Sequence, residues 1–570
     1  MSAPAMTYAE AVAEVTAPGG RFELGTAEVG GTVLPVFTQA PPSLRTIFES
    51  WPGRGDDLFL VYEDERLSFG AVAAQVGGAG AALVERYGVG PGDRVAIAMR
   101  NLPEWVVTFA AVTSVGAVAV SLNAWWTADE LAYGLEDSGA TVLVADVERV
   151  ERTREAAARL GVATIGVRLP EGDVHRSVDR WEDVVDPSAS LPDAAIAPDD
   201  DATILYTSGT TGRPKGAVST HRAVIHAVMS FGARALVQRR RRPEEARVAA
   251  AQPPCFILIV PLFHVTGCVA VMLTCAASGT PLVMMRKWSP ERALELIERE
   301  RVTNFVGVPT QSWDLMESPR FAEFDTSSLV SVGGGGAPSP PALVARVDAG
   351  FKRGRPSIGY GMTETNAFGP QNSGEDYVTH PTSTGRSLPT LLVEVRDPDG
   401  VAVPVGAQGE IWFRGPSVIR GYWNRPEATA EAIVDGWLRT GDVGRIDDEG
   451  FVYVEDRAKD LVLRAGENVS CAEVEAAVYE HPAVYEAAVF GVPHERLGEE
   501  VAVAVLPKAG MPLDPEELRA HVAARVAGFK VPSRVVVVDQ TLPRNAAGKI
   551  LKRELRDQVV ADEAGGPSVG

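Results

Sequence analysis

The sequence predicts an α/β protein in which a β-rich unit precedes a mixed C-terminal region. Apolar runs at residues 94–99, 141–145 and 304–308 are typical of buried strands, and Ala- and Glu-rich helical stretches separate them. This alternation of strand and helix indicates parallel sheets covered by helices. Between about residues 370 and 455 the pattern changes to short alternating strands with Gly-rich turns, which indicates a separate β-rich unit.

Individual elements follow from the same patterns. Residues 290–301 predict a helix, because Ala293, Leu294 and Ile297 share one apolar side, and the following residues return to a sheet. Past Arg457 the pattern is mixed. We expect there a helix at 472–480, strands at 487–490, 501–506 and 535–538, a helix opened by Asp514 and Pro515, a loop at 543–549 and a charged C-terminal helix.

Residues 265–285 carry no charge and are long enough to resemble a membrane span. Gly279, Thr280 and Pro281 interrupt them, so a buried helix followed by a strand at 282–285 is the better prediction. The first residues include acids and lack a basic start with an apolar stretch, so they do not predict a signal peptide. The four cysteines show no metal or disulfide spacing, which suits buried thiols in a reducing cytoplasm.

The charge of the chain bears on its partners. Its 570 residues carry a formal net charge of -21, which disfavours nucleic acid and anionic membranes as main ligands, so phosphorylated ligands need locally positive sites. The basic run Arg239 to Arg242 could contact an acidic carrier or a membrane surface. A solvated loop is the favoured interpretation, and we assign the run no role.

The strongest local signal is a loop rich in glycine and small hydroxyl residues that follows the strand predicted at 202–206. It consists of Thr207, Ser208, Gly209, Thr210, Thr211, Gly212, Arg213, Pro214 and Lys215. Small residues let backbone N–H groups approach a triphosphate, and the terminal lysine adds a cation. The glycine–lysine spacing is not that of a Walker A loop, and a flexible surface turn is the alternative interpretation.

This loop resembles the phosphate-binding signature of the adenylate-forming superfamily, which includes acyl- and aryl-CoA synthetases, beetle luciferases and peptide-synthetase adenylation domains. Further resembling segments follow in the family's order at 336–338, 360–365, 440–442, 456–460 and 543–549. The resemblance extends from about residue 45 to 556. It implies a large N-terminal domain at 1–455 built from doubly wound α/β subdomains and a small β-barrel-like subdomain, a hinge at 456–460, and a small mobile α+β domain at 461–570.

The resemblance gives each segment a ligand. It implies adenine binding by Gly336, Ala337, Pro338, Tyr360, Gly361 and Met362. Glu364 would hold Mg²⁺, with Thr363 on phosphate. Asp442 would accept the ribose hydroxyls, reinforced by Arg457. Lys549 would bridge the attacking carboxylate and the α-phosphate. Taken singly, Glu364 fits a helix-capping carboxylate, Asp442 a turn residue, and Lys549 an exposed residue of a basic tail.

The acyl group is expected near His264, which resembles the residue at the family's acyl-pocket entrance. We expect it to gate or orient the substrate without acid–base chemistry, although a core histidine is the plain alternative. The predicted wall of the pocket comprises Val265, Val308, Pro309, Thr310, Gly333, Gly334 and Gly335. These residues are small or apolar, with no obvious partner for an amino-acid substrate, so a fatty, aryl or polycyclic (sterol-type) acid fits better, with a weak preference for fatty acids.

These parts predict an acyl-CoA synthetase that uses ATP and Mg²⁺ to form an acyl-adenylate and then transfers the acyl group to coenzyme A. The resemblance implies rotation at Lys459, which would bring the turn Gly466, Glu467 and Asn468 toward the coenzyme A tunnel. Alternatives are loading of a carrier protein, release of the adenylate, a luciferase-like oxidation and a non-catalytic nucleotide or acyl sensor. The sequence leaves the oligomeric state open, a homodimer included.

Overall fold

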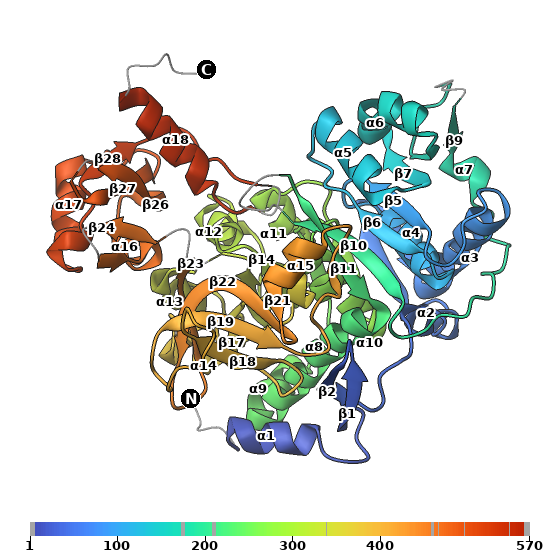
Figure 1. The fold of residues 1–570 in the computed structure, drawn as a ribbon, viewed down its shortest axis with the longest axis horizontal. Helices are drawn as coiled ribbons and strands as arrows, with labels where there is room; N and C mark the ends of the chain where they lie inside the picture. Colours follow the sequence, from blue (N-terminus) through green and yellow to red (C-terminus); the bar gives the residue numbers. More distant parts are fainter. Residues whose placement is uncertain are drawn as a thin grey trace.

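Buried apolar runs form the strands of two eight-stranded sheets in a computed structural model (Figure 1). The structure describes residues 6–172, 177–207, 213–337, 339–457, 461–464, 467–494, 496–545 and 548–563. The first sheet has the order β20-β11-β10-β6-β5-β7-β8-β9, and all its neighbouring strands are parallel except β11 and β20. Its strands are β5 (Arg94–Ala98), β6 (Val118–Ser121), β7 (Val142–Asp146), β8 (Ala163–Val167), β9 (Val178–Arg180), β10 (Asp201–Thr207), β11 (Lys215–Thr220) and β20 (Gly421–Tyr422).

The second sheet has the order β17-β16-β15-β14-β12-β13-β3-β4, with antiparallel strands only at its two edges. Its strands are β3 (Leu58–Tyr62), β4 (Glu65–Ser68), β12 (Phe256–Leu258), β13 (Leu282–Met284), β14 (Asn304–Gly307), β15 (Ser331–Gly335), β16 (Arg355–Gly359) and β17 (Gln371–Ser373). The parallel strands end on the same side of the sheet, where open α/β sheets usually bind ligands.

Helices connect the strands of both sheets (Figure 1). Helix α5 (Ala128–Ser138), which contacts the predicted phosphate loop (residues 207–215) at Pro214, begins with a capping box between Thr127 and Glu130 and ends at the left-handed Gly139. The main connecting helices are α3 (Phe69–Glu85), α4 (Pro103–Ser114), α5 (Ala128–Ser138), α6 (Val147–Leu160), α8 (His221–Arg241), α11 (Pro290–Arg299), α12 (Pro309–Glu317) and α13 (Pro341–Gly350). The helix predicted at 290–301 is therefore present as α11.

The predicted β-rich unit is a five-stranded antiparallel sheet. Its strands are β18 (Leu392–Arg396), β19 (Gly409–Arg414), β21 (Ile433–Val434), β22 (Trp437–Ile446) and β23 (Val452–Arg457). A second five-stranded sheet follows near the C-terminus. Its strands are β24 (Val462–Arg464), β25 (Glu467–Val469), β26 (Val484–His494), β27 (Gly498–Pro507) and β28 (Arg534–Val537), and it packs with α16 (Cys471–Tyr479), α17 (Pro515–Ala523) and α18 (Lys552–Glu563).

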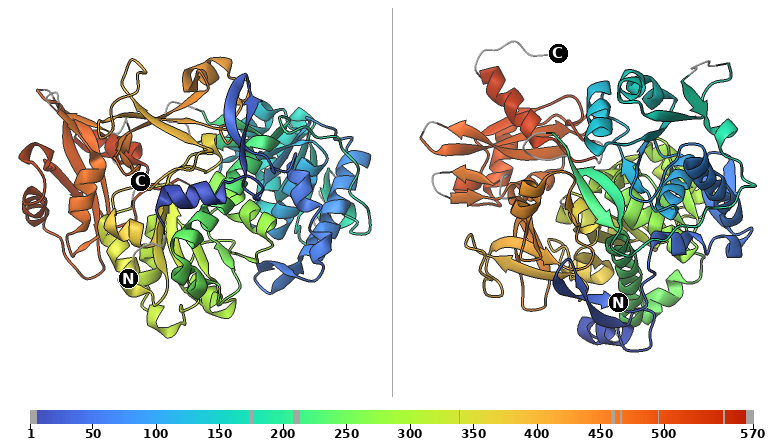
Figure 2. Two further views of the ribbon diagram at one scale, coloured as in Figure 1. Left: turned by 90° about the horizontal axis from the view of Figure 1, so that it is seen from below. Right: turned by 45° about the vertical axis from the view of Figure 1, so that its right-hand side comes forward.

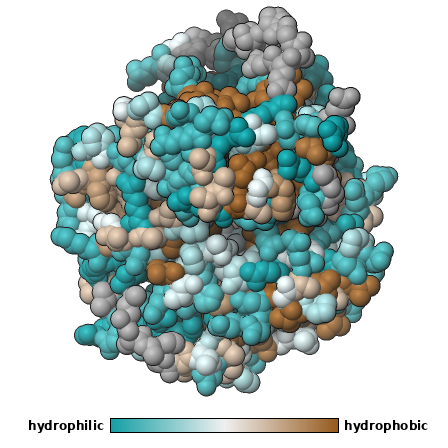
Figure 3. Space-filling model, turned by 90° about the vertical axis from the view of Figure 1, so that its left-hand side faces the viewer, coloured by the Kyte–Doolittle hydropathy of each residue, from teal (hydrophilic) through white to brown (hydrophobic). Residues whose placement is uncertain are grey.

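The C-terminal sheet and its helices stand to one side of the larger α/β part (Figures 1 and 2). The face that they present is mainly hydrophilic, with apolar residues in separate groups (Figure 3). Asp514 caps α17 by accepting from the backbone N–H of Glu516, and Pro515 is its first residue, as predicted. The mixed α/β fold class predicted from the sequence is confirmed.

The uncharged window at 265–285 contains a helix and a strand, as predicted. The helix starts as a π-helix (Thr266–Leu273), which the sequence did not predict, and continues as α10 (Thr274–Ser278) to the left-handed Gly279. Strand β13 follows. In the described part of the chain, no helix combines the length and the apolar character that crossing a membrane requires. All four cysteines are free and buried.

The basic run Arg239 to Arg242 is not a solvated loop, so the sequence-based interpretation of this run was wrong. It ends α8, and Arg241 is only 4% exposed. Arg241 and Arg242 form ion pairs with Asp376, and Arg242 also pairs with Glu375. Cations near a helix C-terminus are favourable, and here acidic residues distant in sequence cover them. Arg241 and Arg242 therefore serve packing within the chain, whereas Arg239 and Arg240 are exposed.

Candidate active site

The phosphate loop is closed by a strand pair. Thr207 ends β10 and Lys215 begins β11, and the two are antiparallel partners whose contact includes a 3.3 Å hydrogen bond from Thr207 Oγ1 to the Lys215 carbonyl. The loop thus leaves and re-enters the sheet at one point. Ser208, Gly209, Thr210, Thr211 and Gly212 lie outside the described residues.

Helix α5 supports this loop from one side. Tyr133 donates to the carbonyl of Pro214 at 3.0 Å, and Tyr206, on the strand that enters the loop, donates to Asp137 at 2.9 Å. Arg425 forms a 2.6 Å ion pair with the same carboxylate, whose side chain is 7% exposed. A buried carboxylate with several donors holds its neighbours firmly. Asp137 therefore helps to fix the base of the loop.

A single tyrosine, Tyr422, contacts both Glu364 and Lys215. Glu364 is 7% exposed in the short 3-10 helix η4 (Thr363–Thr365), and its Oε1 accepts a 2.7 Å hydrogen bond from Tyr422. Lys215 Nζ lies 4.4 Å from the centroid of the Tyr422 ring. Burial, followed by the charge of Glu364, raises the pKa of Tyr422, so its hydroxyl keeps the proton that it donates. Sequence reasoning missed Tyr422.

The backbone after Glu364 is strained. Asn366 and Ala367 have φ values of 55° and 62°, the left-handed region that residues with a side chain seldom adopt. Asn366 is fully buried and donates to the Ser417 carbonyl at 3.0 Å. Strained backbone persists only where the surroundings hold it, and it is frequent at functional sites. The turn therefore supports a functional interpretation of the neighbouring Thr363 and Glu364.

Two predicted nucleotide contacts meet directly. Tyr360 donates a 2.6 Å hydrogen bond to Asp442 Oδ2, which joins the adenine and ribose segments. Gly361 leaves no room for a side chain, because an added Cβ would lie 2.5 Å from the Ala367 carbonyl oxygen. Gly336, by contrast, has a φ of 77°, and an added Cβ there would meet no atom within 4 Å. The glycine thus borders open space, as a site for a base requires.

The remaining nucleotide residues lie close in the chain to these contacts. Met362 and Ala337 are half-buried, and Pro338 lies outside the described residues. Asp442, 6% exposed, is the backbone partner of Arg457 in the pairing of β22 with β23. The predicted hinge residue, Lys459, lies outside the described residues, two positions beyond this pair.

The loop that carries Lys549 contacts the larger part of the molecule. Lys549 donates its backbone N–H to Asn545 Oδ1 at 3.0 Å, and the Gly548 carbonyl accepts from Arg544 at 2.7 Å. Gly548 has a φ of 83°, and an added Cβ would lie 2.9 Å from Cγ2 of Val308, a predicted acyl-wall residue. The loop therefore packs against the wall. Lys552, three residues after Lys549, pairs with Glu475 at 2.7 Å.

His264 precedes the π-helix and is half-buried. Its Nδ1 accepts from the backbone N–H of Thr266 at 3.3 Å, and burial lowers its pKa to about 4. The imidazole is therefore neutral at pH 7, with its proton on Nε2. A neutral donor can orient a substrate, and π-helical turns are frequent at functional sites.

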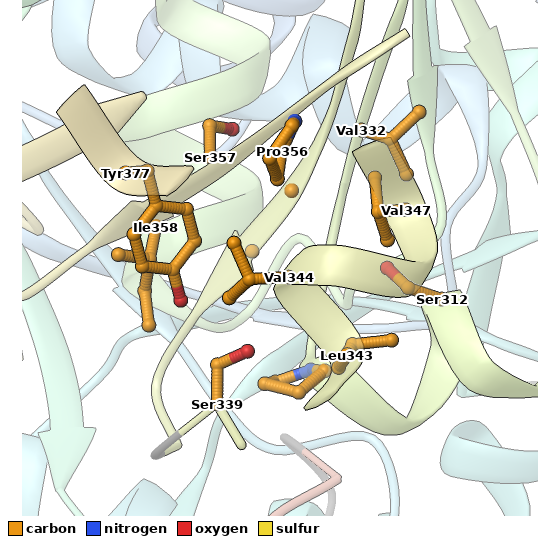
Figure 4. Close-up of a pocket in the computed structure, with 13 residues that line it drawn as sticks. Ser312, Val332, Ser339, Leu343, Val344, Val347, Pro356, Ser357, Ile358 and Tyr377 are labelled. Carbon is orange, nitrogen blue, oxygen red and sulfur yellow. The ribbon is translucent and has the colours of Figure 1, made fainter. Parts of the chain in front are cut away.

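The predicted acyl wall, apart from Val265, lies at the ends of the parallel strands β14 and β15. Gly333, Gly334 and Gly335 end β15, and added Cβ atoms at them would lie 1.9, 2.1 and 2.6 Å from neighbouring atoms, so only glycine fits. A small pocket, partly open to solvent, lies between this strand, β16 and α13 (Figure 4). Its lining includes Pro309, Gly333 and Gly334 but not Val265, Val308, Thr310 or Gly335.

The pocket wall is uncharged. Its side chains are apolar except for hydroxyls, and Ser312, Ser339 and Tyr377 surround it in Figure 4. The predicted coenzyme A turn is elsewhere. Gly466 lies outside the described residues, whereas Glu467 and Asn468 belong to β25 of the C-terminal sheet, and Glu467 is exposed.

Comparison with known proteins decides the family. Residues 47–423 match the model of the AMP-binding enzyme family, and residues 473–549 match the model of the AMP-binding enzyme C-terminal domain. The chain belongs to the AMP-binding enzyme family. It is an AMP-forming acid–CoA ligase, which confirms the resemblance drawn from the motifs and makes ATP and coenzyme A its co-substrates.

Individual relatives of this AMP-binding enzyme agree. It is 38% identical to a feruloyl-CoA synthase of an Amycolatopsis species over 82% of the chain and 89% of that protein. It is 37% identical to a 3-[(3aS,4S,7aS)-7a-methyl-1,5-dioxo-octahydro-1H-inden-4-yl]propanoyl:CoA ligase of Mycobacterium tuberculosis, covering 91% and 98%. The crystal structure of ATP-bound MatB from Rhodopseudomonas palustris is similar with a TM-score of 0.77 and 31% identity, covering 90% and 98%.

Glu364 is a candidate metal ligand among the described residues of this site. Among the residues that the structure describes, no group of three or more His, Cys, Asp or Glu side chains could hold a metal ion. Mg²⁺ commonly takes one or two carboxylates together with substrate phosphates. Glu364 fits the role of such a carboxylate, because the hydrogen bond from Tyr422 to Oε1 fixes its orientation and Lys215 of the predicted phosphate loop lies close to the same tyrosine.

Proposed function

We propose that this ligase activates a carboxylic acid with one carboxylate on an uncharged hydrophobic body. The observation that carries the proposal is the contact of the Lys549 loop with Val308, since it joins the charge-stabilising lysine to the predicted acyl wall. The predicted acyl wall, formed by Val265, Val308 to Thr310 and Gly333 to Gly335, carries no charged side chain, which supports a hydrophobic body. A charged substrate group would require a partner there.

The first half-reaction needs charge stabilisation more than proton transfer. The substrate carboxylate oxygen attacks the α-phosphorus of ATP, the bond from that phosphorus to the bridging oxygen breaks, and pyrophosphate leaves. Lys549 stabilises the charge at the α-phosphate, and the loop from Thr207 to Lys215 with Thr363 holds the departing phosphates. Glu364 would hold Mg²⁺, which supplies charge neutralisation on those phosphates.

The nucleoside is held at the other end of the site. Tyr360 stacks on adenine beside Gly336 and Ala337, and Asp442, reinforced by Arg457, accepts the ribose hydroxyls. The hydrogen bond between Tyr360 and Asp442 supports this assignment, because it fixes both groups before the nucleotide binds. His264 orients the acid as a neutral group.

The second half-reaction requires a different arrangement of the domains. The thiol sulfur of coenzyme A attacks the carbonyl carbon, the bond to the AMP oxygen breaks, and the thiol proton passes to solvent. We assign the rotation to Lys459, between domains at 1–455 and 461–570, and the new tunnel wall to Gly466, Glu467 and Asn468. The four free, buried cysteines are consistent with a cytoplasmic location.

Ring-bearing acids are the substrates to test first. The feruloyl-CoA synthase and the indane-propanoate ligase both carry ring-bearing acids in their names. A fatty acid, the weak preference from the sequence, is the second candidate. The small residues of the wall accept either body.

The test is coenzyme-A-dependent AMP release from ATP, with pyrophosphate followed in parallel, across cinnamate-type, polycyclic, fatty and amino acids. We expect turnover with one hydrophobic class and none with amino acids. A Glu364→Gln control should lose turnover with every acid. Pyrophosphate without thioester would point to carrier-protein loading, and silence across the panel would contradict the proposal.

A further inference from the structure

Tyr422 touches two of the groups proposed to handle the phosphates. Its hydroxyl donates to Glu364 Oε1 at 2.7 Å, and its ring lies 4.4 Å from Lys215 Nζ. We propose, on the basis of the proposed function, that Tyr422 is a positioning residue for the adenylation half-reaction. By fixing Glu364 relative to Lys215, Tyr422 sets how strongly ATP binding depends on a divalent metal ion.

Tyr422 is itself fixed to the strand that carries Lys215. It pairs with Ala217 in the two-residue strand β20, the edge of the first sheet. Trp423 donates its backbone N–H to the Gly216 carbonyl at 2.7 Å, and the Tyr422 N–H donates to Thr429 Oγ1 at 2.9 Å. The backbone of Tyr422 therefore cannot shift without β11.

The same segment holds the turn that carries Glu364. The N–H of Ile419 donates to the Glu364 carbonyl at 2.9 Å, and Asn366 donates to the Ser417 carbonyl at 3.0 Å. Residues 417–423 thus form one strap between β11, which carries Lys215, and the strained turn at residues 363–367. Tyr422 is the side chain of this strap that contacts both Glu364 and Lys215.

The two contacts act through different parts of the ring. The hydroxyl holds one carboxylate oxygen, which decides the direction in which the other oxygen faces a metal ion. The ring face attracts the Lys215 ammonium, which holds that cation near the phosphate loop. Removing the hydroxyl alone should disturb the carboxylate, and removing the whole ring should disturb both groups.

The experiment compares Tyr422→Phe with Tyr422→Leu by calorimetric titration of ATP, with Mg²⁺ and with EDTA. A lost hydrogen bond to a charged group corresponds to about a tenfold change. We expect Tyr422→Phe to weaken ATP binding about tenfold with Mg²⁺ and to leave it unchanged with EDTA. Tyr422→Leu should weaken ATP binding under both conditions, because the Lys215 contact is also lost.

Tyr453→Phe is the matched control. Tyr453 donates to Asp447 at 3.0 Å and carries the Arg445 guanidinium 3.9 Å from its ring centroid, and neither partner is assigned to the phosphates. It should change neither titration. Equal weakening of ATP binding with and without metal in Tyr422→Phe, or a metal dependence identical to that of the parent enzyme, would overturn the inference.

Activity distinguishes this inference from the proposed function. If the parent enzyme performs acid-dependent ATP–pyrophosphate exchange, Tyr422→Phe should require about tenfold more Mg²⁺ for half-maximal exchange. Its use of prepared acyl-adenylate with coenzyme A should be unchanged. If the parent enzyme exchanges with no acid, the proposed function fails. An ATP affinity of the parent enzyme that is independent of metal overturns the positioning role alone.

Discussion

At the scale of residues, Lys549 is expected to separate the two half-reactions. Replacing it with alanine removes the cation proposed to stabilise charge at the α-phosphate, and loss of one such group lowers rates by about 10²–10³-fold. We expect Lys549→Ala to lower acid-dependent ATP–pyrophosphate exchange by this factor. Consumption of prepared acyl-adenylate in the presence of coenzyme A should change little, because that step is proposed to use another domain orientation.

Arg553→Ala is the control for Lys549→Ala. Arg553 lies on α18, shortly after the same loop, and its side chain is 80% exposed. Loss of an exposed cation should leave both half-reactions intact. If Arg553→Ala lowered exchange as strongly as Lys549→Ala, or if both half-reactions fell together in Lys549→Ala, the role of Lys549 would have to be abandoned.

The motifs identified the segments of the candidate site, but they did not identify the side chains that join them. Tyr360 and Asp442 could each be named from their own segment, whereas their hydrogen bond depends on two sheets meeting. Tyr422 was missed because its partners are distant in sequence: the pairing of β20 with β11 brings it to Lys215, and the hydrogen bonds of Ser417 and Ile419 to the turn bring it to Glu364. Local patterns carry no information on such pairings.

At the scale of elements, the lysine loop is expected to depend on Gly548. A residue with a side chain at this position would have to keep a φ of 83°, and its Cβ would lie 2.9 Å from Val308 Cγ2. We expect Gly548→Ala to lower ATP–pyrophosphate exchange about tenfold or more, because a misplacement of about 1 Å can cost 10²-fold. The reaction of prepared acyl-adenylate with coenzyme A should change little.

Gly510→Ala separates loop strain from docking. Gly510 has a φ of 76° in the same C-terminal region, but a Cβ there would meet no atom within 4 Å. This variant should show a similar cost in thermal stability and normal exchange. Similar losses of exchange in the two variants would mean that the contact with Val308 has no part in the reaction.

Helices were predictable where their apolar residues repeat with one clear period or where start signals mark their first turn. Helix α11 was identified because its apolar residues share one side, and the boundary at α17 because Asp514 and Pro515 mark a helix start. The π-helix at Thr266–Leu273 was not predictable, because nearly every residue is apolar and buried, so no period distinguishes it from an α-helix.

At the scale of the whole molecule, Tyr485 joins the C-terminal sheet to the larger part. It donates to Asp314 Oδ1 at 2.7 Å, and Trp288 donates to the other oxygen at 2.9 Å. Asp314 lies on α12, which begins at Pro309 of the predicted acyl wall. We expect Tyr485→Phe to lower adenylation about threefold to tenfold, since a hydrogen bond to a charged group is lost in the orientation proposed for that step.

Tyr479→Phe is the matched control, because its hydroxyl bonds to Ala487 within the C-terminal domain. It should affect thermal stability more than adenylation. Small-angle scattering should report a change in the domain orientation of Tyr485→Phe only. Equal adenylation rates in Tyr485→Phe and the parent enzyme would show that the Asp314 contact does not hold this orientation.

The stability of the whole molecule should fall in mild acid because of two buried histidines. His226 accepts from the Phe37 N–H, His221 accepts from the Leu44 N–H, and burial lowers the pKa of each to about 4. Between pH 6.5 and 4 the unfolded chain binds protons that the folded chain does not, so their stabilisation is complete above pH 6.5 and lost as the pH falls. From pH 7 to 5 the loss is on the order of 2 kcal/mol for each histidine.

Thermal unfolding across this range should show a decreasing Tm. The slope should be shallower in His226→Gln, whose amide can both accept from Phe37 and donate to the Arg222 carbonyl without titrating. An equally steep slope in that variant would contradict the role of His226, because carboxylates such as Asp376, whose pKa lies below its ordinary value, lose their stabilisation only below about pH 4.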